Sequence, residues 1–355
     1  MTQVTSAPTT ETDILDVLKE RPLTFDPFLG KDGHPKLRRC FTEERNPNEH
    51  LIAEKVLQWC LETGIINDTK EARDEVIGFQ LEKYASRVGP TLGVEQLAIL
   101  AQFGAFVVLY DDHNDQLHTR DPESEESLRL IEDRACDIAY GSPVRADDDG
   151  RCVALADLIK RAKVYAHPSW MKKFAYDWKQ FVDSSRWERQ MRQDRVVPPL
   201  HAFLKMRAGT GAFRICLDFV GMLLPSRGKC EYASCFLLQQ MVSYADHQVI
   251  WINDIIGVNT DCQDGVEGNI VVALKNSRGL TWDEAVDCAI NMVNDEIDGF
   301  IALEKEVEYL RGQGELSNGT AEFINCLKSY MRGSMEWSAE TDRYKEWRMM
   351  AEAEV

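Results

Sequence analysis

The sequence has no CxxC pair, no excess of positive charge and no stretch near the ~20 uninterrupted apolar residues that a membrane helix needs. Its 355 residues include 59 acidic and 41 basic ones, which gives a formal net charge of −18. A chain without a basic stripe cannot neutralise a nucleic-acid backbone, and this charge opposes adsorption to an anionic membrane. We therefore expect neither nucleic acid nor a membrane among its partners.

Secretion signals are also missing from the sequence. The first 20 residues are polar and acidic, and no basic stretch precedes an apolar run. The 10 cysteines are scattered and mostly have apolar neighbours, which is typical of buried thiols in a reducing compartment. We predict a cytoplasmic protein with a flexible N-terminal tail over residues 1–24 and a single domain over 25–355.

Strand signals are equally scarce. No run alternates polar and apolar residues over a strand's length, and no Asn-Gly turn joins two such runs. From about residue 48, apolar residues recur at every third and fourth position. Glycine and proline breaks cut the chain into segments of roughly 20–30 residues, and no Gly/Ser/Pro-rich linker separates two halves. The pattern predicts an all-α bundle with one core.

The first motif that carries chemistry is DDHND at 111–115, which ends an apolar helical stretch. Asp111 and Asp115 share one face of a helix, and Asp112 adds a third carboxylate. Carboxylates at a helix C-terminus oppose the macrodipole and repel one another, so stability alone would not select them. Mg²⁺ favours oxygen ligands of this kind. The alternative is an acidic helix end in solvent.

The second motif is NDIIGVNTD at 253–261, which interrupts an apolar run. Asn253, Gly257 and Asp261 are four residues apart and form a stripe about 12 Å long on one helix face. A buried Asn253-Asp254 pair costs stability unless its hydrogen bonds are satisfied. An N-cap at a helix break is the competing interpretation.

Two further features are weak when taken alone. Arg207 lies 46 residues before the second motif and just before Gly209 and Gly211, which indicate a helix break or a close backbone approach. An arginine there could present a fork to a phosphate, although a surface arginine is the simpler interpretation. Near the C-terminus, Arg343-Tyr344 follows an ordinary amphipathic pattern.

Together these features resemble the class I terpene synthases (terpene cyclases) of the single-domain microbial kind, over roughly residues 50–350. The family's aspartate-rich motif matches 111–115, and its second metal motif, Asn-Asp-x-x-Ser-x-x-x-Glu, matches 253–261. The remaining matches are the pyrophosphate-sensing Arg207, the linker and effector positions Thr210 and Gly211, and the terminal pair Arg343-Tyr344, with Trp337 six residues before the arginine.

The resemblance implies a helical bundle around a central apolar cavity, three Mg²⁺ ions, and a prenyl diphosphate substrate, either farnesyl (C15) or geranylgeranyl diphosphate (C20). It implies ionisation, cyclisation to a sesquiterpene or diterpene, release of diphosphate, and a homodimer as the common assembly. The implied metal ligands are Asp111, Asp112, Asp115, Asn253 and Asp261. The implied catalytic and substrate-binding residues are Arg207, Thr210, Gly211, Arg343 and Tyr344, with Phe103, Phe106, Tyr110 and Trp337 lining the pocket.

Two positions depart from the family pattern. Gly257 stands where the family has a serine ligand, and Asp261 stands where it has a glutamate. These departures favour, as an alternative, a non-catalytic helical protein with a degenerate metal site. A trans-prenyl diphosphate synthase is the other alternative, but that family carries two DDxxD motifs and this sequence has Asn253 and Asp254 in the second region.

Overall fold

The computed structural model describes residues 23, 25–30, 34–116, 122–194, 196, 198–224, 235–263, 268–317 and 319–344. Over these residues the chain is helical, and its β interactions are limited to one isolated bridge between Leu29 and Pro35. The predicted all-α fold is confirmed. The predicted tail at 1–24 falls, apart from Leu23, outside the described residues.

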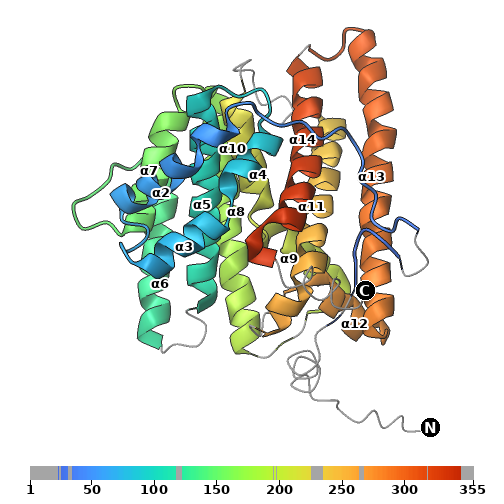
Figure 1. The fold of residues 1–355 in the computed structure, drawn as a ribbon, viewed down its shortest axis with the longest axis horizontal. Helices are drawn as coiled ribbons and strands as arrows, with labels where there is room; N and C mark the ends of the chain where they lie inside the picture. Colours follow the sequence, from blue (N-terminus) through green and yellow to red (C-terminus); the bar gives the residue numbers. More distant parts are fainter. Residues whose placement is uncertain are drawn as a thin grey trace.

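Figure 1 shows the helices as a bundle with long elements in roughly one direction. In chain order they are η1 Glu49–Leu51, α2 Ala53–Thr63, α3 Lys70–Gly78, α4 Leu81–Val88, α5 Val94–Gln116, α6 Pro122–Ala139, α7 Gly150–Ala162, α8 Pro168–Gln193, α9 Leu200–Thr210, α10 Phe213–Leu223, α11 Phe236–Gln263, α12 Ile270–Arg278, α13 Trp282–Gly312, α14 Gly319–Glu340 and η4 Asp342–Tyr344.

The central helix is α5, which packs against α2, α4, α7 and α10. Its segment Val94–Asp112 is the only described one that is long and apolar enough to cross a membrane by length and composition. In the fold, 61% of that window is buried against other helices. Its apolarity is therefore explained by its place in the core, where it packs against four helices.

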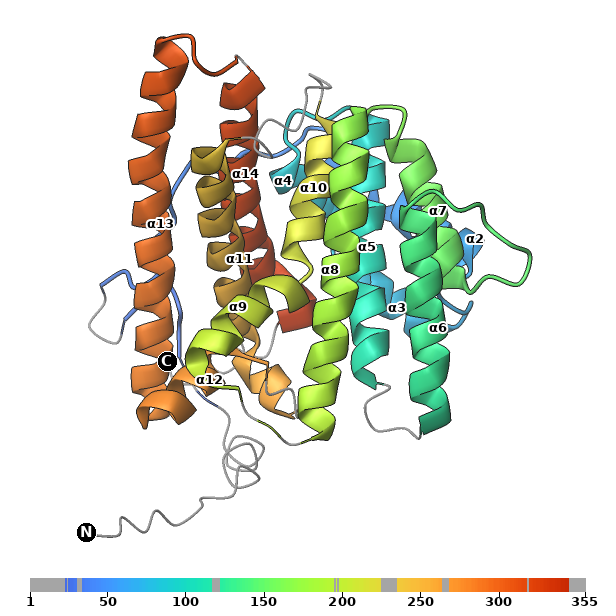
Figure 2. The same ribbon diagram turned by 180° about the vertical axis from the view of Figure 1, so that it is seen from behind.

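Helices α5, α11 and α14 run in the same direction, so their C-terminal ends gather toward one end of the bundle (Figures 1 and 2). A helix C-terminus carries partial negative charge. The end of the bundle at which the two acidic motifs lie is thus electronegative for two reasons, the carboxylates and the helix dipoles. Such an end attracts cations.

The predicted break near Gly209 and Gly211 is present. Helix α9 ends at Thr210, and α10 begins at Phe213. Between them Ala212 has φ +56°, a left-handed conformation that non-glycine residues rarely adopt. Gly209 lies against the side chain of Ser184, where a larger residue would collide with the serine. The chain therefore bends sharply just after Arg207.

The segment before the first helix is tied to the bundle at both ends. The main-chain N–H and C=O of Leu23 pair with the amide side chain of Asn259 on α11, at 2.8 and 2.9 Å. Further along, the buried Asn46 donates to the carbonyls of Gly89 and Leu92 at 3.0 and 2.8 Å. The described residues of this segment, 34–46, cross α13 and α14 and form the N-terminal strap (Figure 1).

Candidate active site

The acidic end of α5 is held by the far end of the chain. Asp111 and Asp112 are half-buried in the last turns of the helix. The guanidinium of Arg343 donates two hydrogen bonds to the Asp112 carboxylate, at 2.6 and 2.7 Å. The side chain of Asp115 lies outside the part of the chain that the structure describes.

Tyr344 joins the second motif to this cluster. Its hydroxyl oxygen accepts a hydrogen bond from Asn253 Nδ2 at 2.6 Å and one from Arg343 Nε at 3.4 Å. Burial raises the pKa of Tyr344, so the hydroxyl stays protonated and keeps its own hydrogen to donate. Residues from α5, α11 and η4 therefore meet at one place, although up to 231 positions separate them in the sequence.

A further carboxylate, which the motifs do not include, lies near the same cluster. Glu75 projects from α3, and burial together with the charge of Asp112 raises the pKa of Glu75. The charge of Asp112 thus disfavours a charged Glu75, while the guanidinium of Arg343 counters part of this effect. Glu75 was missed because the sequence around it reads as an exposed helix face.

The predicted stripe on α11 is present. The side chains of Asn253 and Asp261 are half-buried on this helix, and Gly257 lies between them. A Cβ atom added at Gly257 would lie 3.5 Å from Asp261 Oδ1, so the carboxylate folds back over the glycine. Asn269 donates to the other oxygen, Asp261 Oδ2, at 2.8 Å and fixes its orientation.

Arg207 is paired with the second residue of that motif. Its Nη2 and Nε donate to Asp254 Oδ1 at 2.5 and 3.1 Å, and its Nη1 donates to Thr210 Oγ1 at 3.3 Å. Burial raises the pKa of Asp254, which has no exposed surface. Burial also opposes the charge of Arg207, but attraction to Asp254 outweighs it and the pKa of Arg207 is raised, so the arginine stays charged.

Asn269 is a functional neighbour that sequence reasoning did not single out. Besides Asp261, its Nδ2 donates to the carbonyl of Asp254 at 2.7 Å, and its Oδ1 caps α12 by accepting from Val271 N at 2.9 Å. The Ile270 N–H donates to Asp254 Oδ2 at 2.8 Å. The N-cap signal of an asparagine before an apolar run was available in the sequence, but it did not reveal these contacts with the motif.

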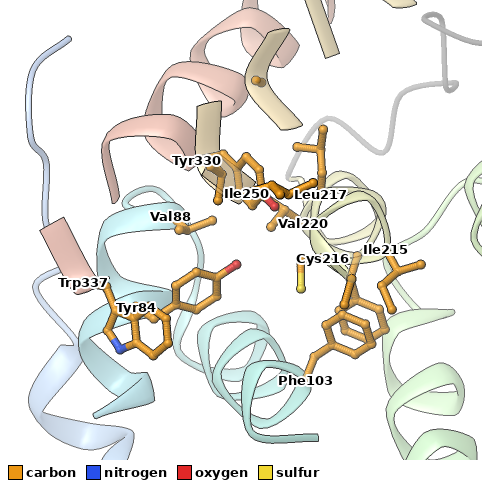
Figure 3. Packing of buried hydrophobic residues seen from close by; sticks show 14 of the residues in the cluster. Tyr84, Val88, Phe103, Ile215, Cys216, Leu217, Val220, Ile250, Tyr330 and Trp337 are labelled. Atoms are coloured by element: carbon orange, nitrogen blue, oxygen red, sulfur yellow. The ribbon is translucent and has the colours of Figure 1, made fainter. Parts of the chain in front are cut away.

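The three aromatic residues predicted on α5 lie in the interior. Phe103, Phe106 and Tyr110 expose 0, 0 and 1% of their surface. The ring of Phe103 is stacked on Phe219 with centroids 3.9 Å apart, and Tyr110 meets Trp178 edge-on at 5.4 Å. Figure 3 shows Phe103 beside Cys216 and Ile215 of α10. These rings therefore pack against α8 and α10 in the interior of the bundle.

Trp337 lies closer to the polar cluster. Its ring is 6.2 Å from the ring of Tyr344 and 5.4 Å from that of Tyr84, both edge-on. Figure 3 shows Tyr84 and Trp337 side by side. The Trp337 indole N–H donates to the carbonyl of Phe79 at 2.8 Å.

A cavity borders Arg207 on the other side, between α8 and α9. Its walls include Trp187, Met191, Phe203 and Met206 beside Arg207. Its volume is about 50 Å³, below the ~300–1,000 Å³ of typical ligand pockets. It can hold a few water molecules or the end of a ligand, and a whole prenyl chain needs more room.

The donor set fits a magnesium site. Asp111, Asp112 and Asp261 offer carboxylate oxygens, and Asn253 keeps its amide oxygen because its nitrogen binds Tyr344. Among the described residues, no three acidic, histidine or cysteine side chains gather closely enough to hold an ion by themselves. Mg²⁺ usually completes its shell with water and substrate phosphates, so a few oxygen donors on each side suit it.

Comparison with known proteins identifies the family of this chain. The family model of terpene synthase family 2, C-terminal metal binding, matches residues 102–298, from α5 to α13. Over 89% of this chain and 95% of its own length, a (+)-T-muurolol synthase ((2E,6E)-farnesyl diphosphate cyclizing) of Roseiflexus castenholzii is 22% identical. The pristinol synthase of Streptomyces pristinaespiralis is 26% identical over 87% of this chain and 84% of its own.

Solved structures support the same fold. The structure of germacradien-4-ol synthase from Streptomyces citricolor superposes with a TM-score of 0.72 and 22% identity, covering 86% of this chain and 98% of that one. An a-eudesmol synthase superposes with a TM-score of 0.74 at 18% identity, over 84% and 97%. Because the family model spans more than half of the sequence, the chain belongs to terpene synthase family 2, and with it to the class I terpene cyclases.

Proposed function

We propose that this terpene synthase ionises farnesyl diphosphate and cyclises the resulting carbocation to a sesquiterpene, with release of diphosphate. The observation that carries the proposal is that Arg343 joins Asp112 of the first motif to the Tyr344 hydroxyl, which in turn binds Asn253 of the second motif. The Roseiflexus relative, whose name states that it cyclises farnesyl diphosphate, supports the C15 chain length. Geranylgeranyl diphosphate is the C20 alternative that the assay below decides.

Two arginines and a tyrosine would bind the leaving group. Arg207 binds Asp254 of α11, and Arg343 lies beside Tyr344, whose hydroxyl binds the adjacent Asn253 and offers its proton. Negative charge grows on the diphosphate as the allylic C–O bond breaks, and fixed donors aimed at that charge stabilise the transition state. The electron pair of the broken bond leaves with the diphosphate.

We propose three Mg²⁺ ions, held by Asp111, Asp112 and Asp115 at the end of α5 and by Asn253 and Asp261 on α11. Bound Mg²⁺ neutralises negative charge on the diphosphate and so makes it a better leaving group. A protein of net charge −18 needs cations to admit a diphosphate at all. The helix dipoles at this end of the bundle favour the same ions.

The break between α9 and α10 has a separate role. A helix break leaves main-chain carbonyl groups outside the helical hydrogen-bond ladder. We assign Thr210 and Gly211, which stand at the break beside Arg207, to stabilising positive charge on the substrate through such dipoles. Phe103, Phe106, Tyr110 and Trp337 would then form the dry aromatic wall that protects the carbocation from water.

Purified protein incubated with geranyl, farnesyl and geranylgeranyl diphosphate tests the proposal. We expect cyclic hydrocarbon or alcohol from the C15 substrate by gas chromatography–mass spectrometry, and none after removal of Mg²⁺ with EDTA. A product from the C20 substrate alone would make it a diterpene synthase. A longer prenyl diphosphate, or no turnover by folded protein, would favour the prenyl synthase or the non-catalytic alternative.

Asn253→Ala tests the second metal site in the same assay. We expect diphosphate release to fall by at least ~100-fold, as for the loss of a transition-state donor. Asn291→Ala, at an exposed position of α13, is the matched control and should behave as wild type. Full activity in folded Asn253→Ala protein would exclude Asn253 as a metal ligand.

A further inference from the structure

The corner between α3 and α4 contains an unusual backbone conformation. Gln80 joins the two helices with φ +51° and ψ +45°, a left-handed conformation that costs energy in a non-glycine residue. Because the chain turns here, the carbonyl group of Phe79 faces α14 and not the axis of its own helix. That carbonyl is a fixed acceptor beside the polar cluster.

Two side chains of the C-terminal segment donate to this acceptor. The Trp337 indole N–H reaches Phe79 O at 2.8 Å, and the Thr341 hydroxyl reaches it at 3.1 Å. The same hydroxyl lies 3.3 Å from the carbonyl of Gly78. Thr341 exposes none of its surface, so no water competes for its hydroxyl group.

Thr341 also receives hydrogen bonds from the residues that follow it. Arg343 N donates to Thr341 Oγ1, and Tyr344 N donates to Thr341 O, both at 3.4 Å. The ring of Phe79 adds a third contact, with its centroid 5.7 Å from the Arg343 guanidinium carbon. Besides Asp112 and Asn253, the Arg-Tyr pair is thus held by Thr341, which is itself bound to the corner.

Glu340, the preceding residue, is held by α4 as well. Its carboxylate accepts a hydrogen bond from Lys83 at 2.9 Å and forms an ion pair with Arg87. Arg87 is 2% exposed and binds Glu43 of the N-terminal strap at 3.0 Å through its Nε. Two successive residues, 340 and 341, are therefore fixed on the same support.

We propose that the α3–α4 corner is the anchor that sets the position of Arg343 and Tyr344. Thr341 is the positioning residue that links this corner to the pair. The inference rests on the proposed function, because the anchored pair is the one assigned to the diphosphate. A fork that binds two oxygens at once tolerates little displacement, since both hydrogen bonds depend on direction. Loss of the anchor should weaken diphosphate binding while the fold remains.

Three variants of the full chain test the anchor. Thr341→Val keeps the shape of the side chain and removes the hydroxyl, and Thr341→Ser keeps the hydroxyl. Thr320→Val removes a buried hydroxyl near the start of α14, the helix that Thr341 follows, and is the matched control. The measurements are amide hydrogen exchange of the segment 341–344 without ligand, and calorimetric binding of inorganic diphosphate with Mg²⁺.

We expect faster exchange at Arg343 and Tyr344 in Thr341→Val, and diphosphate binding weaker by about ten-fold, the effect of one lost hydrogen bond. For Thr341→Ser, both the exchange rate and the affinity for diphosphate should stay within about three-fold of wild type. Equal effects in Thr341→Val and Thr320→Val, or wild-type exchange and binding in Thr341→Val, would overturn the anchor.

If Thr341→Val does not fold, Trp337→Phe removes the other donor to the Phe79 carbonyl and keeps an aromatic ring. Faster exchange at 341–344 in this variant supports the anchor, and unchanged exchange overturns it. The exchange measurement needs no substrate. A wild-type protein that turns over no prenyl diphosphate would therefore refute the proposed function without deciding the anchor.

Discussion

The guanidinium of Arg343 and the carboxylate of Asp112 face each other in a two-pronged hydrogen-bonded pair, at 2.6 and 2.7 Å. Arg207 and Asp254 of α11 form a similar pair. Each arginine assigned to the diphosphate is thus already oriented by a carboxylate of one of the two acidic motifs. The arginines need little reorganisation when a ligand enters, which favours catalysis.

Arg343→Lys should separate charge from geometry. Lysine keeps a positive charge beside Asp112 but cannot donate as a planar fork. We expect product formation to fall by about 100-fold, with a melting temperature close to that of wild type. The loss is measured as kcat and KM with farnesyl diphosphate. Arg311→Lys, at a half-exposed position of α13, is the control. Unchanged kcat and KM would contradict a role for the fork.

Arg207→Ala should destabilise the protein as well as inactivate it. Asp254 is fully buried, and removal of its charged partner costs about 3–5 kcal/mol. Replacing both residues with leucine should restore most of the stability, because a buried ion pair is often no better than an apolar pair. Thermal unfolding measures the first effect. Diphosphate release by the double variant, expected to be absent, shows whether Arg207 is needed beyond stability.

Gly257→Ser should be tolerated and should strengthen the second metal site. The added Cβ atom would be 3.5 Å from Asp261 Oδ1, an ordinary contact distance, and the hydroxyl would add an oxygen donor on the same helix face. We expect half-maximal activity at a lower Mg²⁺ concentration. Gly299→Ser is the control for tolerance, since its side chain would run into the ring of Tyr244 and should lower the melting temperature. An unchanged Mg²⁺ requirement in Gly257→Ser would show that position 257 does not face the ion.

Glu340 should make the stability depend on acid pH. Burial opposes its ionisation, but hydrogen bonds from Lys83 and Arg87 outweigh burial and lower the pKa of Glu340 from 4.5 to about 2. Its contribution is therefore complete above pH 4.5 and is lost as the pH falls toward 2. Denaturant unfolding of wild type and Glu340→Gln between pH 6 and about pH 3 should show a difference that shrinks on acidification. If the stability difference between wild type and Glu340→Gln stayed constant over this pH range, the interactions of Glu340 with Lys83 and Arg87 would not be the cause of the acid sensitivity.

The helices and the placement of the second motif could be predicted because they follow from the local sequence pattern. Apolar spacing predicted the helices, and the stripe of Asn253, Gly257 and Asp261 on one face followed from the helical repeat. The break after Arg207 followed from two glycines, although the residue that adopts the left-handed conformation is Ala212. These features depend on the preferences of neighbouring residues, which a sequence shows directly.

Contacts between main-chain groups and distant side chains could not be predicted in the same way. The acceptor at the α3–α4 corner is the carbonyl of Phe79, a group that every residue has, so no residue type marks it. Asn269 and Thr341 were missed because their partners are defined only when α11, α12 and α14 pack. Which aromatic rings line a pocket and which fill the core also depends on packing.

The distance along the chain between Asp112 and Arg343 has a consequence for synthesis. At the ~5–20 residues per second of translation, the 231 positions from Asp112 to Arg343 take roughly 12–46 s to make. During that interval the carboxylates of α5 exist without the arginine that later binds them, and a fragment that ends before η4 lacks part of the site altogether. On the proposed assignment of Arg343 and Tyr344 to the diphosphate, the site is complete only after the last residues of the described chain have been made.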